Sequence, residues 1–273
     1  VPEDLLSGLV AHGGTGKSLT GLLMALAVAY GRTIGPFVPL RKGRVLYADW
    51  ENQWEMHARR LTRICNGLGI PFGDDEDRIV HWRPRGLGKL VQAETEIVET
   101  AYEHDCVLTI FDSIGFAAGG NLNDNETATV AVNVLKHVPG TKVMIAHISK
   151  AANEGLAQKS PIGSAFFWNG PQAVYDLQTS DPADDGSVIL TIYQNKANVG
   201  AKLKRPLGIR VEFNDDETGG PIVPSEHEIQ GHLIGGEGMS DRQRILDYMR
   251  AFPRPVSAEE LAEQLWDTTE KAK

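Results

Sequence analysis

Apolar residues along this chain follow two alternating patterns. Runs of consecutive apolar residues predict buried strands, and apolar residues three or four positions apart predict helices. In the first half we expect strands at Leu5–Val10, Arg44–Asp49, Ile79–Trp82, Cys106–Phe111 and Lys142–Ala146. We expect helices from Leu19 onward and at Trp54–Leu68, Leu90–Tyr102 and Glu126–His137. This alternation is typical of an α/β fold with a mainly parallel sheet.

The pattern changes in the second half of the chain. Strands are predicted at Gln172–Leu177, Ser187–Gln194 and Gly208–Phe213, joined by Asp/Gly turns and with no helix between the last two. We therefore expect an antiparallel extension of the sheet. Two long loops are also expected, a Gly- and Asn-rich one at Gly115–Asp124 and a polar one at Ala151–Pro161.

These patterns suggest three units. They are an α/β core over residues 1–218, a Gly- and Pro-rich linker over 219–239 and a helical unit over 240–273. In the last unit one helix is expected at Asp241–Ala251, and a second follows Ser257, whose spacing from Glu260 indicates a capping box. This unit resembles the first two helices of a winged helix-turn-helix. A small docking unit is an equally good interpretation, because its six Lys/Arg and seven Asp/Glu give no basic surface.

The segment between the first strand and the first helix carries the clearest chemistry. It reads Ala-His-Gly-Gly-Thr-Gly-Lys-Ser over residues 11–18, the ending of a phosphate-binding loop. Its glycines let backbone N–H groups point inward at phosphate oxygens. Lys17 supplies a positive charge for the β- and γ-phosphates, and the Ser18 hydroxyl is a ligand for Mg²⁺. We therefore predict that ATP is bound by His12, Gly13, Gly14, Thr15, Gly16, Lys17, Ser18 and Leu19. The alternative is a Gly-rich turn that binds nothing.

Three polar residues follow other predicted strands. Asp112 ends an apolar run and is placed to hold Mg²⁺, directly or through water. Hydrolysis also needs a base, and Glu51 is the other carboxylate at a strand end. From position alone, Glu51 is explained equally well as an acid that favours a helix N-terminus. His147 ends a further strand, where a structural hydrogen-bonding role is commoner than a γ-phosphate sensor.

Composition narrows the function classes only a little. The chain has 273 residues and a net charge of −9, from 27 Lys+Arg against 36 Asp+Glu, so bulk charge gives no support for nucleic-acid binding. Its two cysteines, Cys65 and Cys106, suggest neither a disulfide framework nor a metal-binding cluster, which favours a reducing cytoplasm. The longest apolar run, around Leu22–Tyr30, is shorter than the roughly 18 residues that a membrane span needs.

Together these motifs resemble the RecA-like ATPases, and within them the branch of RepA-type plasmid helicases and related phage AAA-family ATPases. The resemblance covers roughly Leu5–Phe213. It rests on residues 11–18, Tyr47-Ala48-Asp49-Trp50-Glu51, Asp112-Ser113, His147-Ile148-Ser149-Lys150, Gly163-Ser164 and Lys196-Ala197-Asn198. It implies a RecA-like P-loop core. It also implies that Glu51 is the catalytic glutamate, that Asp112 supports Mg²⁺ and that His147 senses the γ-phosphate.

The same resemblance implies a hexameric ring around single-stranded nucleic acid. The loops at Lys150–Pro161 and Gly115–Asp124 would face its channel, with Lys150 and Lys159 in contact with the nucleic acid. Each ATP site would be completed by a basic finger from the neighbouring subunit.

The expected finger is missing from its usual place. RepA-like proteins carry an arginine where this chain has Pro171 or Gln172, and a neutral amide cannot supply the charge. Lys196 is the alternative finger, with Lys202, Lys204 or Arg205 as further candidates. A solvated basic hairpin explains the same cluster.

We therefore expect an ATP-hydrolysing motor on nucleic acid, a phage- or plasmid-type replicative helicase or translocase. The alternative is an ATP-switched DNA-binding or recombination factor with weak hydrolysis, which the missing arginine favours. A P-loop small-molecule kinase is a third class, and the absence of an Arg-rich lid over the phosphates argues against it.

Overall fold

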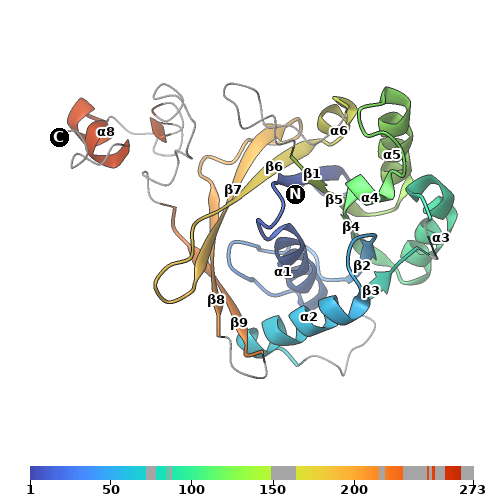
Figure 1. Cartoon of the computed structure of the whole chain (residues 1–273), viewed down its shortest axis with the longest axis horizontal. Helices are drawn as coiled ribbons and strands as arrows, with labels where there is room; N and C mark the ends of the chain where they lie inside the picture. The colour runs from blue at the N-terminus through green and yellow to red at the C-terminus, as the bar shows by residue number, and fades with distance from the viewer. Residues whose placement is uncertain are drawn as a thin grey trace.

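The computed structural model describes residues 1–71, 78–84, 86, 88–148, 164–214, 219–229, 245, 248–249 and 256–265. Its elements are β1 (Leu6–Ala11), α1 (Lys17–Tyr30), β2 (Arg44–Asp49), α2 (Trp54–Leu68), β3 (Ile79–Trp82), α3 (Leu90–Glu103), β4 (Cys106–Asp112), α4 (Ile114–Ala117), α5 (Asn125–His137), β5 (Thr141–His147), α6 (Phe166–Asn169), β6 (Ala173–Thr179), β7 (Val188–Ala197), β8 (Leu207–Phe213), β9 (Ile222–His227) and α8 (Ala258–Leu265) (Figure 1).

These strands form one sheet in the order β3-β2-β4-β5-β1-β6-β7-β8-β9. The first six in that order pair in parallel, and β7, β8 and β9 continue the sheet with antiparallel pairs. The predicted α/β fold, a mainly parallel sheet with an antiparallel extension, is therefore confirmed. In Figure 1, α1 and α2 lie on the side toward which β7–β9 curve, and α3, α4 and α5 lie on the other side.

Both faces of the parallel strands are buried, which explains their unbroken apolar runs. In β2, Val45 and Tyr47 pack into the core that includes α1 and α2. Leu46 and Ala48 alternate with them and pack into the core that includes α3 and α5. The residues at the end of the strand inherit this alternation, so Asp49 and Trp50 point to opposite layers.

Three parts of the described chain differ from the sequence-based expectation. The short helix α4 occupies the start of the predicted loop Gly115–Asp124, and α6 was not expected. One-turn helices carry too little periodicity to be recognised. Residues 222–227, expected within the linker, form β9 and pair along β8. The linker prediction is therefore wrong for this stretch, and the sheet extends at least to His227.

The C-terminal unit lies mostly outside the described residues, as does the predicted loop Ala151–Pro161 and most of the predicted helix Asp241–Ala251. The second expected helix is α8, and the Ser257 hydroxyl accepts a hydrogen bond from the Glu260 N–H at 3.1 Å. Half of the predicted capping box is thus present. Among the helices that the structure describes, none has the length and apolar character that crossing a membrane requires.

The packing of β9 on α2 gives a stability prediction. Gly67 lies within α2, where alanine normally stabilises a helix by about 0.5–1 kcal/mol relative to glycine. A Cβ at this position would lie 2.1 Å from the carbonyl oxygen of Ile222 in β9. We therefore expect Gly67→Ala to lower the free energy of unfolding by about 1–3 kcal/mol, measured by urea denaturation.

Gly115 in α4 provides the matched control. The nearest atom that its Cβ would meet belongs to Leu122, at 3.9 Å, so Gly115→Ala should leave stability unchanged or raise it. A Gly67→Ala protein as stable as this control would contradict the packing of β9 on α2.

Candidate nucleotide site

The predicted phosphate-binding loop joins the end of β1 to the start of α1. Gly14 and Gly16 have φ angles of +78° and +89°, which favour glycine strongly over residues with a side chain. A Cβ added to Gly13 or Gly14 would meet no described atom within 4 Å, so there is open space beside both glycines. The Thr15 hydroxyl donates to the His12 carbonyl at 2.8 Å and closes the turn. The first turn of α1 carries no acidic residue, so its positive dipole end faces the loop unneutralised.

The Lys17 ammonium lies on the floor of this loop. Its Nζ donates to the carbonyl oxygens of His12 at 2.6 Å and Ala11 at 3.2 Å, and only 7% of the residue is exposed. Burial lowers the pKa of Lys17, and the negative charges of Glu51 and Asp112 oppose that shift. A charged ammonium is therefore held at the place where phosphate oxygens would lie.

Asp112 is a buried carboxylate at the end of β4, only 1% exposed. Its Oδ2 accepts a hydrogen bond from the Tyr47 hydroxyl at 2.8 Å, and its Oδ1 has no hydrogen-bond partner within the described chain. Burial raises the pKa of Asp112, whereas interactions with the hydroxyls of Ser18 and Tyr47 lower it. An unsatisfied carboxylate oxygen beside a serine hydroxyl fits Mg²⁺, which prefers oxygen ligands. Ser18 and Asp112 are therefore the residues that would hold the metal.

Glu51 is fixed by its neighbours on both sides. Asp49 Oδ1 accepts hydrogen bonds from the backbone N–H groups of Glu51 at 2.8 Å and Asn52 at 2.9 Å. On the opposite layer, the Trp50 indole donates to the Gly88 carbonyl at 3.0 Å and packs against Trp82, with ring centroids 5.1 Å apart. The loop that carries Glu51 is therefore tied to both cores.

His147 connects Glu51 to Lys17. It ends β5 directly beside Ala11 of β1, so its ring lies next to the phosphate-binding loop. Its Nδ1 is 3.3 Å from Lys17 Nζ, and its Nε2 is 3.7 Å from Glu51 Oε2. Interaction with His147 is the largest cause that lowers the pKa of Glu51, and partial burial opposes it. Glu51 is thus held as a carboxylate, the form that a general base requires.

Comparison with known proteins supports this interpretation at the level of family and fold. A family described as an AAA domain matches residues 1–153, more than half of the chain. The chain belongs to this AAA domain family. Its fold is similar to that of the KaiC-like protein PH0186 from the hyperthermophilic archaeon Pyrococcus horikoshii OT3. The TM-score is 0.54 and the identity 14%, over 82% of this chain and 90% of that chain. No curated protein matches the sequence.

These findings confirm a RecA-like P-loop ATPase of the AAA domain family. Membership of this ATPase family supports nucleotide binding, typically with Mg²⁺. The assignment to the RepA-type helicase branch stays a prediction.

Lys196, the first candidate for a finger, lies apart from the phosphate-binding loop of its own chain. Lys196 pairs with Val174 in β6, and Val174 pairs with Gly8 in β1, three residues before β1 ends. Its ammonium donates to the carbonyl oxygens of Trp168, Asn169 and Pro171 at 2.8–3.0 Å. Lys196 is therefore engaged at the C-terminal end of α6 in its own subunit.

The other residues predicted to act as a finger or to bind nucleic acid are either described by the structure or lie outside it. Lys202, Lys204 and Arg205 are exposed, and Arg205 lies 3.7 Å from Glu228. Gln172, which replaces the expected arginine, accepts a hydrogen bond from the Asn198 amide at 3.3 Å. Lys150 and Lys159 lie outside the described residues.

Tyr47 and Asp49 belong to the motif at the end of the second predicted strand, but their positioning roles were not predicted from the sequence. Tyr47 holds Asp112, and Asp49 holds the Glu51 loop. A signal was present for both, because Tyr47 and Asp49 share one face of β2 and face the same layer as α1. The hydrogen-bond partner of each residue depends on the pairing of β2 with β4. This pairing cannot be deduced from the sequence.

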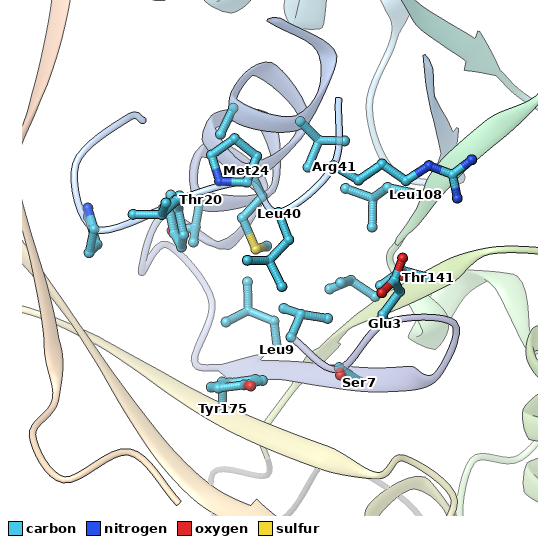
Figure 2. A pocket seen from close by; sticks show the side chains of 18 of the residues that line it. Glu3, Ser7, Leu9, Thr20, Met24, Leu40, Arg41, Leu108, Thr141 and Tyr175 are labelled. Carbon is cyan, nitrogen blue, oxygen red and sulfur yellow. The ribbon is translucent and has the colours of Figure 1, made fainter. Parts of the chain in front are cut away.

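A cavity of about 270 Å³ lies elsewhere in this AAA domain. Its lining includes Ser7 and Leu9 of β1, Thr20 and Met24 of α1, and Leu40 before β2 (Figure 2). No residue of the loop from His12 to Ser18 lines it, so it is distinct from the nucleotide site.

The geometry of Lys17 gives a binding prediction. We expect Lys17→Ala to weaken ATP binding by about 10- to 100-fold, the effect of losing charged hydrogen bonds worth about 1.5–3 kcal/mol. Binding of a fluorescent ATP analogue would measure this. Lys42→Ala, at an exposed lysine before β2, is the control and should bind normally. Undiminished affinity of Lys17→Ala would remove the assignment of this loop to phosphate.

Proposed function

We propose that this AAA domain is an ATP-driven motor that translocates along or unwinds DNA during replication, as a hexameric ring of the RepA type. The observation that carries the proposal is the continuous line of polar contacts from Lys17 through His147 to Glu51. This line places a phosphate ligand, a candidate sensor and a candidate base at one edge of the sheet. The two cysteines are free and buried, in keeping with a reducing cytoplasm.

In this proposal, different residues of the chain bind the phosphates, hold the metal and accept the proton from water. Bound Mg²⁺·ATP would supply the electrophilic γ-phosphorus and the charge of the metal. Lys17 and the N–H groups of the loop would orient the phosphates, and Ser18 and Asp112 would hold the metal. Glu51, a carboxylate within reach of His147, would accept the proton of the attacking water.

His147 is suited to report the state of the nucleotide to the rest of the molecule. It lies at the end of β5, two residues before segment 149–163 begins. The residue that follows this segment, Ser164, donates its N–H to the Leu122 carbonyl at 2.6 Å and its hydroxyl to the Asn125 side chain at 2.6 Å. Ser164 is therefore hydrogen-bonded to Leu122 in the predicted loop Gly115–Asp124 and to Asn125 at the start of α5.

Two exposed aromatic side chains support a single-stranded DNA partner. Phe116 on α4 is 59% exposed and Phe166 on α6 is 41% exposed. Exposed aromatic rings offer stacking platforms for unpaired bases. Lys150 and Lys159 would add phosphate contacts, a local basic channel on a chain whose net charge is −9.

A ring is supported by the position of the basic hairpin. Lys196 is separated from the phosphate-binding loop of its own subunit, so a role as a finger requires a neighbouring subunit. Lys202, Lys204 and Arg205 are exposed beside it and are the further candidates for this role.

One observation favours the second candidate function, an ATP-switched DNA-binding factor with weak hydrolysis. Lys196 makes three hydrogen bonds to carbonyl oxygens of its own chain, and an ammonium engaged in this way is not free to reach a neighbour. Burial also lowers the pKa of Lys196. Steady-state ATP hydrolysis with and without single-stranded DNA separates the two functions, because only the motor predicts strong stimulation.

The role of Glu51 is tested by removing its charge. We expect Glu51→Gln to bind ATP normally and to lose hydrolysis by about 10²- to 10⁴-fold, the usual contribution of a general base. Phosphate release in single- and multiple-turnover assays would measure this. Glu55→Gln, an exposed acid in the first turn of α2, is the matched control. If both variants turn over ATP at the normal rate, Glu51 is only an acid at a helix end.

The DNA partner is tested at Phe116. Loss of one stacked base costs about 1–3 kcal/mol, so we expect Phe116→Ala to weaken binding of a fluorescent oligonucleotide by about 5- to 150-fold. Tyr102→Ala, at a ring on α3 that is 68% exposed, controls for the loss of an exposed aromatic side chain. Equal affinity of the two variants for single-stranded DNA would exclude Phe116 from the contact surface.

A further inference from the structure

A cluster of metal-ligating side chains lies behind the Glu51 loop. It consists of Asp49 at the end of β2, His57 in α2 and His81 in β3. One ligand atom from each residue lies within 4.8 Å of those of the other two. The three residues are 0%, 1% and 11% exposed, so the cluster is buried with one edge, at His81, near the surface.

The fold brings these three side chains together from distant parts of the sequence. His81 pairs directly with Tyr47 of β2, and directly paired residues project from the same face of a sheet. Asp49 is two residues beyond Tyr47 and therefore shares that face. The first turns of α2 cover it and place the His57 ring 4.9 Å from the Tyr47 ring and 5.8 Å from the His81 ring.

The atoms of the cluster converge on one carboxylate oxygen. His57 Nε2 contacts Asp49 Oδ2, and His81 Nε2 lies 3.8 Å from the same oxygen. Asp49 Oδ2 and His57 Nε2 are both buried and contact each other, and His81 Nε2 is the next polar atom near this oxygen in the described part of the chain. The three ligand atoms thus lie close enough together to share one cation after small side-chain shifts.

We propose that Asp49, His57 and His81 form a binding site for Zn²⁺. Two imidazoles and one carboxylate are a ligand set that zinc takes in proteins, with the fourth position left to water or another ligand. To hold a metal, the Asp49 and His57 atoms would move slightly apart and His81 would move slightly closer to them. His81 is the least buried of the three and lies nearest to solvent.

This site is distinct in its chemistry from the magnesium site. Mg²⁺ prefers oxygen ligands, which Ser18 and Asp112 provide, whereas imidazole nitrogens suit zinc. Millimolar Mg²⁺, which ATP hydrolysis requires, would therefore leave the cluster available to Zn²⁺.

The two sites are connected through Asp49. Its Oδ2 would bind Zn²⁺, while its Oδ1 accepts the N–H groups of Glu51 and Asn52. The metal would fix the Asp49 carboxylate and through it the loop that carries Glu51. It would also join β2, α2 and β3 at the edge of the parallel sheet. Asp49, His57 and His81 are positioning residues in this proposal, since none of them is placed to touch the nucleotide.

The experiment is direct metal binding to the full chain, without nucleotide or DNA. Purified protein is stripped with a chelator, loaded with Zn²⁺ in the presence of millimolar Mg²⁺, passed through gel filtration and analysed for metal. We expect one zinc ion per chain. Loading with Co²⁺ should give the intense visible d–d bands of a four-coordinate site, and Zn²⁺ should abolish them.

Two histidine variants identify the site. His81→Gln removes the most exposed ligand, and we expect it to weaken Zn²⁺ binding at least about tenfold and to lose the Co²⁺ bands. His137→Gln is the matched control, since His137 is 67% exposed and contacts only Glu94 among the described residues. It should retain both signals. Circular dichroism of each variant verifies that it is folded.

The wild-type measurement alone can overturn the proposal. Less than stoichiometric zinc in the folded wild-type chain, or equal zinc in His81→Gln and His137→Gln, would mean that the cluster is a buried Asp–His group without a metal. Because no ATP or DNA is present, this result does not depend on the proposed motor. A wild-type chain whose ATP hydrolysis is strongly stimulated by single-stranded DNA but which binds no zinc would support the motor and reject the zinc site.

Discussion

The register of the parallel strands at their carboxyl ends is the constraint on which the site depends. Parallel strands present their carboxyl ends at one edge of the sheet, and ligands of α/β proteins bind there. Here Asp49 pairs with Asp112, and Ala11 pairs with His147. The polar residues that end β2, β4 and β5 therefore lie side by side with the start of the phosphate-binding loop, at one edge of the sheet. A slip of one residue in β2 would turn Asp49 and Tyr47 to the opposite layer and separate them from Asp112.

The site also contains buried charge, which the fold compensates locally. Lys17 is 7% exposed, Asp112 1% and Asp49 0%. Two backbone carbonyls solvate Lys17, the Tyr47 hydroxyl solvates Asp112, and two backbone N–H groups solvate Asp49. Burial alone would raise the pKa of Asp49, but its contacts with His57 and His81 and these N–H groups outweigh that effect and lower it. The charged groups are thus held in place before nucleotide arrives, and little reorganisation is left for the reaction itself.

Much of this arrangement could be predicted from the sequence, and the rest could not for physical reasons. Buried parallel strands have unbroken apolar runs, so the strands that end at Asp49, Asp112 and His147 were found, and with them the polar residues that follow. Strand β9 was missed because Pro224 and the glycines before it read as a linker, although an edge strand tolerates proline. The partners of Tyr47, His57 and His81 depend on strand pairing and on which face of α2 is buried. Neither the strand pairing nor the buried face of α2 can be deduced from the residues near these three positions in a single sequence.

Trp50 has a consequence for how motion would spread from the site. Its ring is anchored among Trp82, Phe111 and the Gly88 carbonyl, in the layer opposite to the one that holds Asp49. Its backbone N–H donates to the Asp112 carbonyl at 2.7 Å, which joins the end of β2 to the end of β4. The three residues from Asp49 to Glu51 therefore form a mechanical link across the sheet. A displacement of Glu51 would disturb the packing of Trp50 in the core that includes α3, and the indole fluorescence of Trp50 would report it.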